Sequence, residues 1–175
     1  MSDILPVTKA LAAAEDPNAE PMELRCFTAE EARAALPDFA ELIELWMARR
    51  GGAAVPDWRD FDFADFRGWH DSLVVGRFEG DEPDPTLRLA GQTYIEVTQQ
   101  NPTGRRLSEL APRMFDLYYR EHFRQIRDHG LIGLAVGRQP LKGRSHVQLR
   151  ILELPFRDGG PGVARTLHVL AKKTR

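Results

Sequence analysis

The chain has 175 residues, the length of one ordinary domain, and a core of that size buries about 70% of the unfolded surface. Its 24 basic residues nearly balance 26 acidic ones, and a net charge of -2 excludes the strong positive field of a dedicated nucleic-acid or anionic-membrane binder. The single cysteine, Cys26, excludes an internal disulfide and a multi-cysteine metal site and favours a reducing compartment. With no signal-peptide pattern and no long apolar run, we expect a cytoplasmic protein without membrane or nucleic-acid partners.

The N-terminal part divides into a lead-in and a helical segment. Residues 1–27 have little periodic apolar pattern, so we expect a flexible lead-in in which Cys26 is a bystander thiol. Residues 28–52 carry helix signals, beginning with Thr28 and Glu31, whose spacing is that of a capping box.

An amphipathic helix follows within residues 28–52. Its apolar positions recur at i, i+3, i+4 and i+7 before the stop at Gly51, and they are Phe39, Leu42, Ile43 and Trp46. Such a face needs a partner, which is either the sheet of the same domain or the same helix of a second subunit.

The remainder alternates between strand patterns and helices. The best helix pattern spans residues 112–129 and ends at Gly130, a residue that tolerates a left-handed helix end. Its apolar stripe consists of Phe115, Tyr118, Tyr119, His122, Phe123 and Ile126. Strand patterns cover residues 72–78, 86–90, 131–137, 145–154 and 163–171. This order predicts an α+β fold: a five-stranded antiparallel sheet with short helices over one face and an N-terminal amphipathic helix.

The run from Thr86 to Gln92, followed by the turn and restarted helix from Asn101 to Leu110, resembles the PAS domain superfamily. The likeness covers about residues 40–171, and we assign residues 53–175 to a PAS-like domain. A closer resemblance is to a bacterial stand-alone single-domain PAS family common in alphaproteobacteria. The residues that carry it are Leu45-Trp46, Arg50-Gly51, Pro56, Asp60-Phe61-Asp62 and Gly91. Gln92 departs from that family, which usually has threonine there.

The PAS resemblance implies a cavity between the sheet and the short helices, mainly apolar with few polar anchors. The residues expected to line it are Leu89, Tyr94, Ile95, Phe115, Tyr118, His122, Phe123, Val147 and Leu149. Leu87 and Leu89 are expected to share one face of their strand by the period of two. The alternative is that all these side chains simply fill the core.

No cofactor or metal is expected. Some haem-binding PAS domains ligate iron from the helix that here carries His122, but His129 lies about 10.5 Å further along the helix and cannot share a metal with it. Light-sensing PAS domains that form a cysteinyl adduct carry an Asn-Cys-Arg motif, whereas this chain has no cysteine after Cys26.

The sequence therefore favours a stand-alone sensory or regulatory module in signal transduction and not an enzyme. The adjacent pair His70-Asp71 has no accompanying catalytic motif and is interpreted as a surface pair. Because the chain ends at Arg175, soon after the last strand, we expect a separate protein partner to carry the output. Expected partners are a small apolar or amphipathic ligand, that output protein, and a second copy bound through the N-terminal helix. Two alternatives stay open: a cone-shaped isomerase or cyclase with an Asp-His pair in its pocket, and a ligand-free dimerisation module.

Overall fold

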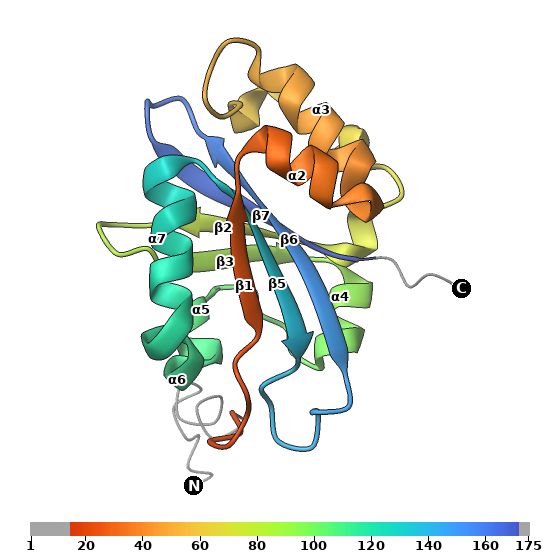
Figure 1. The fold of residues 1–175 in the computed structure, drawn as a ribbon, viewed down its shortest axis with the longest axis vertical. Helices are drawn as coiled ribbons and strands as arrows, with labels where there is room; N and C mark the ends of the chain where they lie inside the picture. The colour runs from red at the N-terminus through yellow and green to blue at the C-terminus, as the bar shows by residue number, and fades with distance from the viewer. Residues whose placement is uncertain (1–14, 172–175) are drawn as a thin grey trace, which may run out of the picture.

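A single seven-stranded sheet forms the centre of the computed structural model, which describes residues 15–171 (Figure 1). The strand order is β1-β5-β6-β7-β2-β3-β4, and each neighbouring pair is antiparallel. The strands are β1 (Glu23–Phe27), β2 (Leu73–Phe78), β3 (Pro85–Ala90), β4 (Arg105–Arg106), β5 (Ile132–Arg138), β6 (Gln148–Arg157) and β7 (Val163–Leu170).

The five predicted strands are confirmed as the consecutive strands β5, β6, β7, β2 and β3, and the sheet gains a further strand at each edge. One of these edge strands, β1, lies within the predicted lead-in, so the expectation of a flexible segment is wrong for residues 23–27. The strand pairs with β5 from Glu23 opposite Val136 to Phe27 opposite Ile132. The partner strand is more than a hundred residues away in sequence, so the local pattern gave no sign of the pairing.

Helical segments cover both faces of the sheet. On one face lie α2 and α3, which pack side by side, together with the short turns that follow them. The segments between β3 and β5 lie on the opposite face and end in α7, which contacts β1, β5, β6 and β7. The helices are α2 (Ala29–Ala35), α3 (Ala40–Arg50), α4 (Gln92–Thr98), α5 (Leu107–Leu110), α6 (Pro112–Met114) and α7 (Arg120–His129). The 3-10 turns are η1 (Pro37–Phe39), η2 (Trp58–Asp60), η3 (Phe63–Phe66) and η4 (His70–Ser72), and η5 (Phe115–Tyr119) is a π-helical segment. No helix within residues 15–171 is long and apolar enough to cross a membrane.

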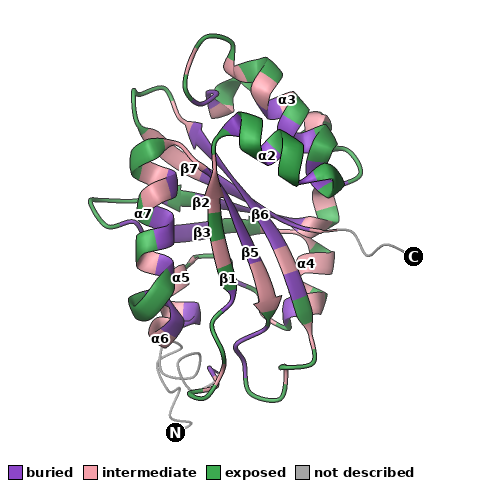
Figure 2. Ribbon diagram, in the orientation of Figure 1, coloured by how far each residue is buried: buried purple, intermediate pink, exposed green. Residues whose placement is uncertain are grey.

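The apolar face of α3 packs against the sheet of its own domain. Leu42, Ile43 and Trp46 of α3 are buried in one cluster with residues of β6 and β7. Figure 2 shows that buried and exposed positions alternate along α3. The indole Nε1 of Trp46 also donates a hydrogen bond of 2.8 Å to the carbonyl of Pro155, in β6. The capping box before α2 is confirmed, since Thr28 and Glu31 exchange both bonds. The first of the two partners considered for the amphipathic helix is therefore correct, and this face is not available to a second subunit.

The Trp46→Ala variant is expected to lose about 3–5 kcal/mol of unfolding free energy, because it removes a buried aromatic side chain and leaves a cavity. Chemical denaturation of the variant and the unsubstituted protein measures the difference. The matched control is Glu44→Ala on the exposed side of the same helix, which removes only a surface ion pair to Arg33 and should cost less than about 1 kcal/mol. Equal losses in the two variants would contradict this packing.

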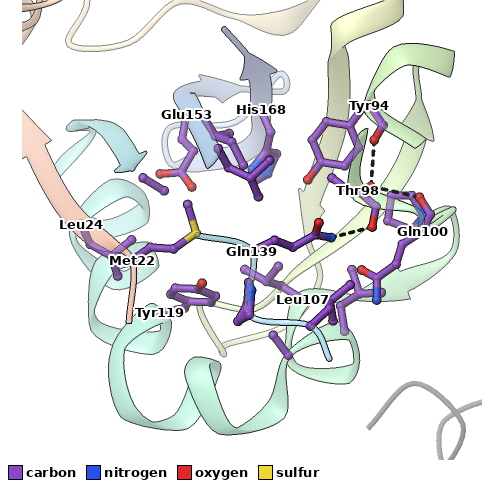
Figure 3. A pocket seen from close by; sticks show the side chains of 18 of the residues that line it. Met22, Leu24, Tyr94, Thr98, Gln100, Leu107, Tyr119, Gln139, Glu153 and His168 are labelled. Atoms are coloured by element: carbon purple, nitrogen blue, oxygen red, sulfur yellow. Dashed lines mark hydrogen bonds between the residues drawn. The ribbon is translucent and has the colours of Figure 1, made fainter. Parts of the chain in front are cut away.

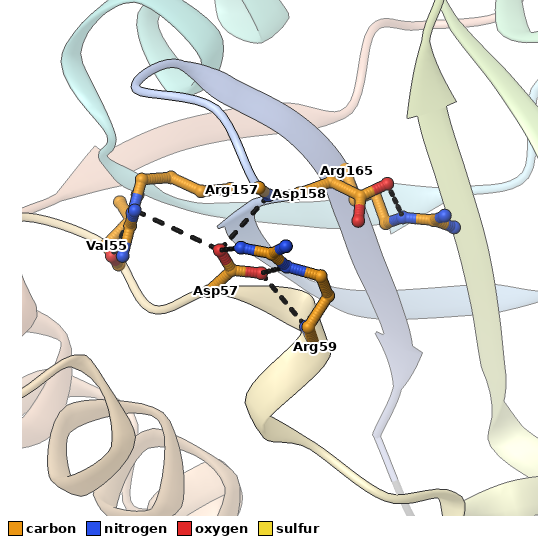
Figure 4. Close-up of polar contacts among 7 residues, drawn as sticks. Val55, Asp57, Arg59, Arg157, Asp158 and Arg165 are labelled. Atoms are coloured by element: carbon orange, nitrogen blue, oxygen red, sulfur yellow. Dashed lines mark hydrogen bonds and ion pairs between the residues drawn. The ribbon is translucent and has the colours of Figure 1, made fainter.

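The loop after α3 is held to the β6–β7 hairpin by the buried carboxylate of Asp57 (Figure 4). The carboxylate accepts bonds of 3.1 and 3.0 Å from the Arg59 guanidinium. It also accepts from the backbone N–H groups of Arg59 and Gly159, at 3.0 and 3.1 Å. These bonds, those from Arg59 first, hold the pKa of Asp57 well below its ordinary value of 3.8.

The lowered pKa predicts a stability contribution that changes with pH. Because the folded state disfavours the protonated form of Asp57, the contribution is present above the ordinary pKa of 3.8 and is lost as the pH falls below that value. The Asp57→Asn variant should melt several degrees below the unsubstituted protein at pH 7, and the gap should narrow at pH 3. Thermal unfolding at both pH values tests this, with the exposed Asp81→Asn as the control. A gap that is the same at both pH values would count against the assignment.

Candidate functional site

A cavity of about 100 Å³ lies between the sheet and the helices from α4 to α7 (Figure 3). Most of its wall is apolar. Apolar side chains that line it include Met22, Leu24, Leu107, Ala135, Leu149 and Ile151. Polar side chains in the wall are Tyr94, Thr98, Gln100, Tyr119, Gln139, Glu153 and His168. An apolar chamber with a few polar groups has the character of a small-molecule site.

The structure brings together only part of the predicted lining. Tyr94, Phe123 and Leu149 line the cavity. Tyr118 and His122 instead line a second hollow, on the outside of the helical run over residues 112–129. The other four predicted residues do not line the cavity. Leu89 is exposed and Phe115 is fully buried. Ile95 and Val147 are half-buried.

A bulge explains the position of Leu89. The register between β2 and β3 shifts so that Leu87 lies opposite Gly76 and Leu89 lies opposite Val75. Gly76 and Val75 are consecutive residues of β2 and point to opposite faces, so Leu87 and Leu89 do as well. The expectation that the two leucines share one face is therefore wrong, and Leu89 is 47% exposed.

A π-helical segment explains the outward position of Tyr118. The predicted helix over residues 112–129 is confirmed as the continuous run of α6, η5 and α7, but η5 departs from α-helical spacing. A π-bulge adds residues to one turn and rotates the side chains on either side of it relative to each other. Phe115 and Phe123 therefore point into the protein while Tyr118 is 37% exposed.

Glu153 and His168 were not predicted as site residues from the sequence. The strand pattern of β6 nevertheless indicates Glu153. Leu149 and Ile151 alternate along the inward face of β6, and the next inward position of that strand is Glu153. A carboxylate at an inward position of a strand indicates a functional or paired group. His168 lies directly opposite Glu153 on β7, a pairing that only the sheet register shows.

The polar groups form two hydrogen-bonded sets on the sheet. The His122 Nε2 atom bonds Glu153 Oε2, and the His122 Nδ1 atom lies 3.5 Å from the Cys26 sulfur. On the neighbouring strand, His168 Nε2 lies 2.8 Å from the hydroxyl oxygen of Thr166. Cys26 is half-buried and contacts His122, and its role as a bystander thiol stays a prediction.

Two glycines make room for these sets. A Cβ atom on Gly133 would overlap Glu153 Oε2 and would also meet His122. A Cβ atom on Gly76 would overlap the Thr166 hydroxyl. The polar groups therefore lie where the sheet has no side chain beneath them.

The protonation states follow from burial and from the Glu153 charge. Burial opposes the charged form of His122, but the Glu153 carboxylate and then Cys26 outweigh burial and raise the pKa of His122 to about 10. Burial lowers the pKa of His168, which is therefore neutral at pH 7. With both ring nitrogens of His122 engaged, the ring has no free atom for a metal. Within residues 15–171, no group of three His, Cys, Asp or Glu side chains is placed to hold a metal ion.

Of the other polar groups in the cavity wall, some have hydrogen-bond partners and one does not. Gln139 donates to the Thr98 carbonyl at 2.5 Å, and the Thr98 hydroxyl donates to the Tyr94 carbonyl at 2.8 Å. The side-chain nitrogen of Gln100 is buried and has no hydrogen-bond partner within residues 15–171. Burial, and then the Glu153 charge, raise the pKa of Tyr94 to about 12 and the pKa of Tyr119 further still, so both hydroxyls keep their protons.

The second hollow is an open groove of about 540 Å³ between β1 and the helix that includes η5. Its lining includes Cys26, Leu117, Tyr118, Glu121 and His122. Since Glu153 lines the inner cavity and His122 lines the outer groove, the ion pair between them connects the two spaces.

We expect His122→Leu to cost about 3–5 kcal/mol of unfolding free energy, because it leaves the Glu153 carboxylate as an uncompensated buried charge. Glu153→Leu should cost less, because burial then returns His122 to its neutral form. The double variant should cost clearly less than the sum of the two, since it leaves no charge behind. Urea unfolding of all four proteins gives the coupling energy. Additive losses would show that the two groups do not act as an ion pair.

Comparison with known families identifies the fold. A family model described as a PAS domain matches residues 35–171. A search of curated proteins gave no match. Among solved structures, the chain is similar to an RNA-binding light-oxygen-voltage receptor at 19% sequence identity, with a TM-score of 0.45. That alignment covers 61% of this chain and 31% of the receptor, so this chain spans less than a third of the receptor's length. The narrower likeness to an alphaproteobacterial family stays a prediction. On the family match, which covers most of the sheet and its helices, the chain belongs to the PAS domain family.

Proposed function

We propose that this PAS domain senses a small ligand in the cavity between the sheet and α4–α7 and reports it to a protein partner. Membership of the family assigns a sensory or signalling role in general terms. The proposal adds to this general role a small ligand in the cavity and a protein partner that receives the signal.

The observation that carries the proposal is a chamber between the sheet and the helices with one buried polar group that has no partner among the described residues. The wall is mainly apolar, yet Gln100 Nε2 is buried without a hydrogen-bond partner among the described residues. Buried polar groups in folded proteins are almost always bonded to protein, water or ligand. A ligand that bonds this group and fills the apolar space supplies the missing contacts.

The ion pair offers a route by which the cavity can influence the surface. A ligand that contacts Glu153 competes with or strengthens the bond between Glu153 and His122. The His122 ring lines the outer groove, beside Cys26 of the edge strand β1 and the π-helical segment η5. Segments with π-helical geometry are frequent at functional sites. A change inside the cavity therefore reaches a surface that a partner protein can read.

The two alternative functions have less support. The isomerase-like enzyme needs an Asp-His pair that acts on a substrate, whereas the cavity's carboxylate is already bonded to His122. The adjacent His70-Asp71 forms no such pair either, because His70 bonds the Phe63 carbonyl at 2.6 Å. A dimerisation module would use the apolar face of α3 to bind a second copy, but that face is buried against the sheet of its own domain.

The proposal predicts that filling the cavity removes the ligand. In native mass spectrometry, the protein purified from its source cells should carry a small molecule, and Ala135→Leu should reduce its occupancy at least about tenfold, because the added carbons take up the cavity. The matched control is Ala54→Leu, the same change at an exposed position, which should leave the occupancy unchanged. The proposal fails if the unsubstituted protein carries no small molecule, or if Ala135→Leu carries as much as the control.

A further inference from the structure

The chemistry of the cavity wall restricts the ligand that it can accept. Glu153 is the charged side chain of the wall, because His168 is neutral and no Arg or Lys is among the described residues that line it. One oxygen of the carboxylate, Oε2, is bonded to His122. The other oxygen, Oε1, accepts no hydrogen bond from residues 15–171, and the side chain points into the chamber in Figure 3.

An ionised carboxylate only accepts hydrogen bonds, so Oε1 requires a donor. The Glu153 side chain lines the cavity, and a hydrogen bond to a charged group is stronger than one between neutral groups, so a ligand that fills the cavity is penalised unless it donates to Oε1. The ligand atom nearest to Glu153 therefore carries a hydrogen, as in an alcohol or an ammonium group.

The residues of the cavity wall also restrict the charge of the ligand. A bound anion would lie in an apolar chamber near the Glu153 carboxylate with no Arg or Lys in the described wall to neutralise it. The Glu153 charge also disfavours ionisation of the Tyr94 and Tyr119 hydroxyls, after the larger effect of burial. The His122–Glu153 pair is neutral overall, but its negative end lines the cavity while its positive end lines the outer groove. Anions are thus disfavoured relative to neutral and cationic molecules of equal size.

The volume sets the size of the ligand. The cavity measures about 100 Å³. An engineered protein cavity of about 150 Å³ accepts one benzene molecule, so this ligand has on the order of four to six non-hydrogen atoms. Haem and flavins are several times larger than this space.

We infer that the ligand is a small neutral or cationic molecule that donates a hydrogen bond to Glu153 Oε1 and buries a short apolar body against Ala135 and Leu149. This inference rests on the proposed function, since it names the ligand class of the same cavity.

Four probes of nearly equal size test the inference with the full-length protein. They are 1-butanol, a neutral donor; n-butylamine, a cationic donor; methyl propyl ether, an isomer of butanol without a donor; and butyrate, an anion. Dissociation constants come from titrations followed by two-dimensional NMR at pH 7. We expect 1-butanol and n-butylamine to bind at least about tenfold more tightly than the ether and butyrate. In Glu153→Gln, butylamine should lose its advantage over butyrate, because the charge that distinguishes them is gone. The probe series in the unsubstituted protein is decisive whether or not that variant folds.

The outcomes separate the ligand class from the proposed function. If the ether binds as tightly as 1-butanol, or butyrate binds more tightly than butylamine, the inferred class is wrong. The cavity function then stands provided that Ala135→Leu blocks that binding. If no probe binds while the purified protein carries a small molecule of another kind, the inferred class is likewise wrong. If the purified protein carries no small molecule, the proposed function itself is overturned, whether or not a probe binds.

Discussion

The arrangement of this protein depends on an ion pair, His122 with Glu153, buried between the sheet and its longest helical run. Burying two charges is expensive, and their attraction offsets the cost only when both partners stay in place. The pair holds α7 over β6. It also requires a glycine at position 133, because a Cβ atom there would overlap Glu153 Oε2. Through Cys26 it also connects α7 to the edge strand β1. A segment that looks like a lead-in is therefore joined to the same network as the cavity.

The two faces of the sheet differ in how completely they are packed. On one face, Trp46 and the other apolar residues of α2 and α3 form a dry core with β6 and β7. On the other face, the helices between β3 and β5 leave a chamber and an external groove on either side of the ion pair. Because its packing is less complete, the second face carries polar groups that a well-packed core would exclude. This division suits a sensor, since a ligand can alter the second face without unfolding the first.

Much of the fold was predictable because it depends on local patterns. The capping box at Thr28, the amphipathic helix with Trp46 and the glycine stop at Gly130 were all confirmed, since each depends on residues a few positions apart. The candidate site was predicted only in part, because its lining depends on register. A bulge in the β2–β3 pairing turned Leu89 outward, and the π-helical segment turned Tyr118 towards the groove. Both irregularities shift the period on which sequence patterns rely.

By itself, the sequence determined the five central strands, the helical run over residues 112–129 and the PAS resemblance, because periodicity and turn chemistry are local properties. Only the tertiary structure decided which polar residues meet. Cys26, His122, Glu153 and His168 come from four elements that are distant in the sequence, and strand pairing together with the docking of α7 brings them together. A buried charge is tolerated only beside its partner, so the meaning of Glu153 could not be read from β6 alone.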